Sequence, residues 1–122
     1  MQNPLRIHKV CFKHAFAGFI YAIKTQPNFR FHLLATMVAI LLGLYFLISP
    51  TEWLILIFTI NTVLVAEMVN TAIEAMVDLI TLERRADAKT AKDVASAMVL
   101  VSATLSVVIA IIIFLPKILK AI

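Results

Sequence analysis

Four oxygen-bearing side chains recur along one apolar stretch of this 122-residue chain. They are Glu67, Asn70, Glu74 and Asp78, set in a run of mostly Ile, Leu, Val, Met and Ala. In a helix, where each residue advances by about 100°, all four fall within a stripe about 80° wide. Carboxylate and amide oxygens are the ligands that a hard cation such as Mg²⁺ prefers. The spacing therefore indicates a candidate cation site on one helix face.

The composition of the chain makes this polar stripe unusual. The sequence is 62% hydrophobic and 15% charged, with a mean hydropathy of +1.00, whereas soluble domains carry about 25% charged residues. A carboxylate at the centre of a bilayer costs at least about 2.5–3.5 kcal/mol. We therefore expect the stripe to face protein, water, a metal ion or a phosphate. A polar seam between packed helices is the alternative, and for Asn70 alone it explains the residue equally well.

Three apolar runs predict an all-α integral membrane protein that forms one domain over residues 1–122, because about 20 helical residues cross a bilayer. The predicted spans are residues 29–49, 52–80 and 93–115. Thr51 is the expected N-cap of the second span. Pro116 is expected to end the third.

Before the first span, residues 5–26 predict an amphipathic helix on the membrane surface. Its apolar face consists of Phe12, Phe16, Phe19, Ile20 and Ile23. Gln26-Pro27 should end this helix, because proline disfavours the helical conformation of the residue before it.

Basic residues predict the orientation. The N-terminal segment carries five Lys or Arg residues. Residues 81–93, which comprise the predicted loop 81–92 and Asp93, carry four. The opposite side has only Lys117 and Lys120. The positive-inside rule then places the N-terminus and the loop in the cytoplasm.

The basic loop lies next to the acidic end of the stripe, which extends the chemistry from metal ions to phosphates. Topology alone accounts for its basic residues, namely Arg84, Arg85, Lys89 and Lys92. Lys92-Asp93, however, stands at the entry to the third span, where Lys92 could hold a polyphosphate. Asp93 could cap the helix or help to bind a metal ion. Acids for a metal and bases for phosphate indicate phosphoryl transfer, with Glu67, farthest from the loop, as the candidate base for a lipid hydroxyl.

The segments Glu67–Glu74, Val77-Asp78 and Ala91-Lys92-Asp93 resemble the signature of the small prokaryotic diacylglycerol kinase and undecaprenol kinase family. Asn28–His32 and Ile113–Lys117 resemble its undecaprenol kinase branch. The resemblance implies a homotrimer with active sites shared between subunits, in the cytoplasmic (inner) membrane of a bacterium. It also implies ATP as phosphoryl donor, Mg²⁺ as cofactor and a lipid alcohol as substrate, with undecaprenol favoured over diacylglycerol.

By the same resemblance, Glu67 is the catalytic base and Glu74 a metal ligand. The nucleotide-binding residues it implies are Asn70, Glu74, Asp78, Glu83, Lys92 and Asp93. Gln26 stands where the family commonly has a metal-binding glutamate. Its carbonyl oxygen can bind Mg²⁺ but brings no charge, so we expect a weaker site unless Asp78 or Asp93 compensates.

Two other interpretations stay open at this point. The acids could line an ion or proton pathway, or the chain could be a non-enzymatic assembly subunit, in which case the basic loop would only fix the topology. The histidines, His8, His14 and His32, are interpreted as interfacial hydrogen-bonding groups rather than zinc ligands. Beside apolar spans the positive charge indicates anionic lipid or polyphosphate, and not nucleic acid.

Overall fold

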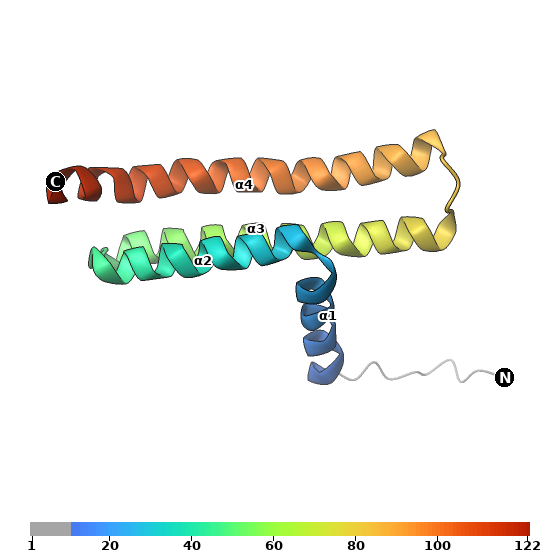
Figure 1. The fold of residues 1–122 in the computed structure, drawn as a ribbon, viewed down its shortest axis with the longest axis horizontal. Helices are drawn as coiled ribbons and strands as arrows, with labels where there is room; N and C mark the ends of the chain where they lie inside the picture. Colours follow the sequence, from blue (N-terminus) through green and yellow to red (C-terminus); the bar gives the residue numbers. More distant parts are fainter. Residues whose placement is uncertain (1–10) are drawn as a thin grey trace.

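A computed structural model describes residues 11–122, which form four helices and no strand (Figure 1). The helices are α1 (Phe12–Thr25), α2 (Pro27–Tyr45), α3 (Pro50–Ile80) and α4 (Ala86–Ala121). The last three are each long and apolar enough to cross a membrane. The prediction of an all-α chain with three candidate spans is therefore confirmed.

The three long helices lie side by side, and α1 projects from the middle of this bundle (Figure 1). Helix α3 runs antiparallel to both α2 and α4, and it packs most extensively against α4. Residues 5–10 of the predicted surface helix lie outside the described part of the chain. Phe12 and Phe16 are 82% and 67% exposed, and the contact of this face with a membrane stays a prediction.

The junction between α1 and α2 follows the prediction made from Gln26-Pro27. Helix α1 ends at Thr25, Gln26 is extended with φ −110° and ψ 104°, and Pro27 begins α2. The ring of Phe19 meets the fully buried ring of Phe29 edge to face, with 5.5 Å between centroids. This contact anchors α1 against α2 and so fixes the place of Gln26 between them.

The turn between α2 and α3 corrects the predicted cap. Ser49, and not Thr51, is the N-cap, because its hydroxyl accepts from the N–H of Glu52 while the Glu52 carboxylate accepts from the N–H of Ser49. Helix α2 ends four residues before the predicted boundary of 49, in a Schellman turn in which the N–H of Ile48 donates to the carbonyl of Gly43. Leu47 adopts a positive φ of 50° there.

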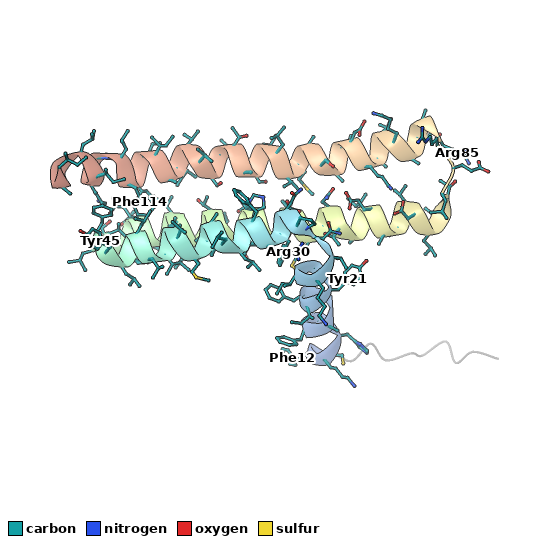
Figure 2. All side chains as sticks on the ribbon, in the orientation of Figure 1. Phe12, Tyr21, Arg30, Tyr45, Arg85 and Phe114 are labelled. Atoms are coloured by element: carbon teal, nitrogen blue, oxygen red, sulfur yellow. The ribbon has the colours of Figure 1, made fainter. Side chains whose placement is uncertain are left out.

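Tight packing gathers at this turn, where α2, α3 and α4 meet. The buried cluster consists of Ile48, Leu56, Ile113 and Phe114, and Figure 2 shows Phe114 and Tyr45 at this end of the bundle. A Cβ on Gly43 would lie 2.7 Å from the Trp53 ring, so only glycine permits this approach. An ion pair of 2.8 Å between Lys117 and Glu52 joins the end of α4 to the start of α3.

Two predicted boundaries of α4 were wrong. The loop predicted over 81–92 covers only 81–85, because the Ala- and Lys-rich segment after Arg85 continues the helix. Asp93 therefore lies inside α4 and is not its cap. Pro116 also lies inside α4, which continues to Ala121. Membrane helices tolerate proline where neighbouring groups satisfy the freed carbonyl.

Candidate active site

The polar stripe lies on α3 as predicted, and its burial increases with distance from the loop. Asp78, near the loop, has a half-exposed side chain, and Glu74 is partly buried. Asn70 is 8% exposed and Glu67 only 2% exposed. Glu67 lies about 20 Å along the helix from the loop end of α3. The stripe thus leads from the open end of the bundle into its interior.

The deep part of the stripe lines a cavity of about 280 Å³, here called the polar cavity. Its lining comes from the α1–α2 junction and from α2, α3 and α4. The polar residues are Gln26, Asn28, His32, Glu67, Asn70, Glu74 and Ser96. The structure therefore brings the predicted base, Glu67, into one space with both predicted metal ligands, Glu74 and Gln26.

Two oxygen atoms in this cavity are buried without a hydrogen bond to any residue of 11–122. They are Oε1 of Glu67 and Oδ1 of Asn70. The amide nitrogen of Asn70 donates to Oε1 of Glu74 over 3.2 Å. This hydrogen bond orients the Asn70 amide and so determines where its free Oδ1 lies. Buried polar atoms without protein partners are costly, and in proteins they bind water or an ion or belong to a reactive group. Both atoms are acceptors, so the cavity is suited to a proton donor and a cation.

The oxygen atoms of the polar cavity suit Mg²⁺, which takes part of its ligands from water and substrate, better than a metal ion bound by protein side chains alone. No group of three His, Cys, Asp or Glu side chains able to hold a metal ion occurs within the described range 11–122. The polar cavity instead offers the Glu74 carboxylate with the amide oxygens of Gln26 and Asn70. Mg²⁺ typically uses one or two carboxylates and completes its shell with water and substrate phosphates. The set of one carboxylate and two amide oxygens is therefore suited to Mg²⁺.

The remaining predicted residues line a second space, the loop cavity, with a volume of about 710 Å³. Its charged lining consists of Asp78, Glu83, Arg84, Arg85, Lys89, Lys92 and Asp93, and Figure 2 shows Arg85 at this end of the bundle. The volume lies within the range of about 300–1,000 Å³ common for small-molecule sites.

Ion pairs hold several of these groups. Nζ of Lys92 lies 2.5 Å from Oδ1 of Asp78, and Lys89 pairs with Asp93 on the same helix. Neither Asp78 nor Asp93 lines the polar cavity. The expectation that one of them compensates for Gln26 at the metal site therefore gains no support from this arrangement.

His32, interpreted from the sequence only as an interfacial hydrogen-bonding group, lies in the candidate site. Its Nε2 lies 3.4 Å from Oε1 of Glu67, and its side chain is only 15% exposed. Asn28, one turn before it on α2, lines the same cavity. Two polar residues four apart on a mostly apolar helix share a face, and this spacing is the signal that could have found them.

Residues 13–114 match the family described as prokaryotic diacylglycerol kinase. The chain is 40% identical over 116 residues to an undecaprenol kinase of Bacillus subtilis, covering 95% of this chain and 94% of that one. It is 34% identical over 112 residues to a diacylglycerol kinase of Synechocystis, covering 91% of this chain and 64% of that one. A diacylglycerol kinase of Pseudomonas aeruginosa is 35% identical over 91 residues, covering 75% of this chain and 74% of that protein.

Proposed function

The chain belongs to the prokaryotic diacylglycerol kinase family, and from this premise we propose that it transfers the γ-phosphate of ATP to undecaprenol at the polar cavity. The coarser function, a lipid kinase of a bacterial membrane, follows from the family and from three helices fit to span a membrane. The near full-length similarity to an undecaprenol kinase favours undecaprenol over diacylglycerol. An ion or proton pathway would use the acids differently, and family membership weighs against it.

One observation carries the proposal. A buried carboxylate, Glu67, has a free oxygen in the same cavity as Glu74, and the basic loop cavity opens farther along the same helix. Phosphoryl transfer needs a proton acceptor, charge neutralisation and positioning, and no covalent nucleophile. The two cavities supply these three functions in sequence along α3.

ATP occupies the loop cavity in this proposal. Lys92, with Arg84, Arg85 and Lys89, offsets the charge of the phosphates, while Asp78, Glu83 and Asp93 contact the nucleotide. The γ-phosphate then points along α3 towards Asn70 and Glu74. The distance from Asp78 to Glu67, about 16 Å along the helix axis, leaves room for the phosphates between the loop and the base.

The lipid hydroxyl lies beside Glu67. Its oxygen attacks the γ-phosphorus and forms the new P–O bond, while the bond from that phosphorus to the bridging oxygen of ADP breaks. The hydroxyl proton passes to the Glu67 carboxylate, and ADP leaves with the electron pair. The products are a lipid phosphate and ADP.

Glu74, Gln26 and the free Oδ1 of Asn70 would hold Mg²⁺. Bound there with ATP, the ion would neutralise charge on the phosphate oxygens. Glu74 is the only carboxylate in this set, and Asn70 keeps it oriented through its 3.2 Å hydrogen bond.

The proposed setting is the cytoplasmic membrane of a bacterium, with the N-terminus and the loop in the cytoplasm. The basic residues of the N-terminal segment and the loop support this orientation. The homotrimer with shared active sites rests on the family resemblance. The many exposed Leu, Ile, Val and Phe side chains of α2, α3 and α4 leave ample surface for lipid and for neighbouring subunits.

The test is a transfer assay with detergent-purified protein, radiolabelled ATP, Mg²⁺ and either undecaprenol or diacylglycerol. We expect label in the lipid fraction, with a higher kcat/KM for undecaprenol. A higher value for diacylglycerol would reverse the substrate assignment. Failure to label either lipid, in protein that still binds ATP, would refute the kinase proposal.

A further inference from the structure

His32 lies where two cavities of different character meet. It lines the polar cavity, and it also lines a space of about 160 Å³ between α2, α3 and α4, here called the apolar cavity. The side chains that dominate this space are Ala35, Ala39, Leu56, Ile60, Val63 and Ala110. Thr36, Thr59 and Ser106 line it too, and the hydroxyls of Thr59 and Ser106 donate to carbonyls of their own helices over 2.7 Å each.

This junction has the layout that a lipid alcohol needs. The hydroxyl must reach Glu67 in the polar cavity, while the carbons next to it must leave into an apolar space. At about 160 Å³ the apolar cavity is smaller than the usual site for a whole ligand, so it would hold only the part of the chain nearest the hydroxyl. His32 stands beside that path.

His32 also faces the proposed base. Its Nε2 lies 3.4 Å from the one buried oxygen of Glu67 that has no hydrogen bond from residues 11–122. This distance is slightly longer than a hydrogen bond. Catalytic hydrogen bonds are often long before substrate binds and shorten in the complex. An N–H at this position would fix the rotation of the Glu67 carboxylate.

We propose that His32 is a positioning residue for the transfer step, holding Oε1 of Glu67 so that the carboxylate faces the lipid hydroxyl. The inference rests on the proposed function, because it presumes that Glu67 accepts the proton. A histidine that merely packs between α2 and α3 would contribute to stability but not to the turnover of a correctly folded enzyme.

The test compares His32→Leu, which removes the N–H, with His32→Gln, which keeps an N–H donor. His14→Leu is the matched control, since His14 is exposed on α1 and lines none of the three cavities. We expect His32→Leu to lower kcat about tenfold or more, as loss of positioning does, with the KM for ATP unchanged. We expect His32→Gln to recover most of that loss and His14→Leu to behave as the unaltered protein.

The melting temperature in detergent is measured for every variant. Normal kcat in both His32 variants would refute the positioning role. An equal loss of kcat in both His32 variants, or a loss of kcat that accompanies a lowered melting temperature, would assign His32 to packing instead. Absence of transfer by the unaltered protein would refute the proposed function itself. Measurement of the unaltered protein therefore distinguishes failure of the proposed function from failure of the positioning role.

Discussion

Lys92 of α4 and Asp78 of α3 form an ion pair with 2.5 Å between Nζ and Oδ1, and this contact joins the two helices that line the loop cavity. Both side chains are partly exposed, at 38% and 52%. Exposed ion pairs contribute only about 0–1 kcal/mol. A triphosphate, which carries several negative charges, should therefore displace Asp78 from Lys92 at little cost. In our proposal, the phosphates of ATP therefore take the place of Asp78 beside Lys92.

Lys92→Gln tests this interpretation. Hydrogen bonds to charged groups are worth about 1.5–3 kcal/mol, so the KM for ATP should rise about tenfold or more. Lys120→Gln is the control, because it removes the same charge at the opposite end of α4. Steady-state kinetics over a range of ATP concentrations gives both values. An unchanged KM for Lys92→Gln would remove Lys92 from the nucleotide site.

Glu67→Gln tests the proposed base. The amide keeps the size of the side chain but cannot accept the proton, and general bases contribute about 10²–10⁴-fold to rates. We expect kcat to fall at least about 100-fold while ATP binding, measured by equilibrium dialysis, stays the same. Asp87→Asn, an exposed position of α4 that lines neither the loop cavity nor the polar cavity, should preserve far more of the turnover. Turnover of Glu67→Gln near the normal rate would transfer the base role to another group.

The three apolar helices and the α3 stripe could be predicted from the sequence, because both depend on local periodicity. Helix ends were less predictable: Ser49 outcompeted Thr51 as cap because Glu52 completes the reciprocal pair of hydrogen bonds. Asp93 proved to lie inside α4 because the residues before it are good helix formers. His32 did not stand out because its proposed role depends on a contact with Glu67, 35 residues away along the chain. Such a contact arises from helix packing, which cannot be read from a single sequence.

Leu47→Gly should stabilise the turn between α2 and α3. Leu47 has a φ of 50° and occupies the position of a Schellman turn where glycine is usual. The left-handed conformation costs a residue with a Cβ roughly 1–2 kcal/mol, part of which glycine loses again through entropy of the unfolded chain. We expect a small rise in the melting temperature in detergent. Leu44→Gly, inside α2, should lower it, since glycine costs about 1 kcal/mol in a helix.

Gln26→Glu addresses the position at which this chain departs from the family resemblance. Gln26 is fixed at the junction of α1 and α2 and lines the polar cavity with Glu74. A glutamate there would add a second carboxylate to the donor set without a change in size. Mg²⁺ binds sites with one or two carboxylates plus phosphates, so the Mg²⁺ concentration for half-maximal activity should fall several-fold.

The matched control for this change is Thr25→Glu, which adds the same charge one residue away at an exposed position outside the polar cavity. It should leave the Mg²⁺ dependence unchanged. Titration of Mg²⁺ at saturating ATP and lipid provides the measurement for both variants. Equal curves for Gln26→Glu and the unaltered protein would show that residue 26 does not contribute to the metal site. Equal shifts in the two variants would instead reveal a general effect of negative charge near the cavity.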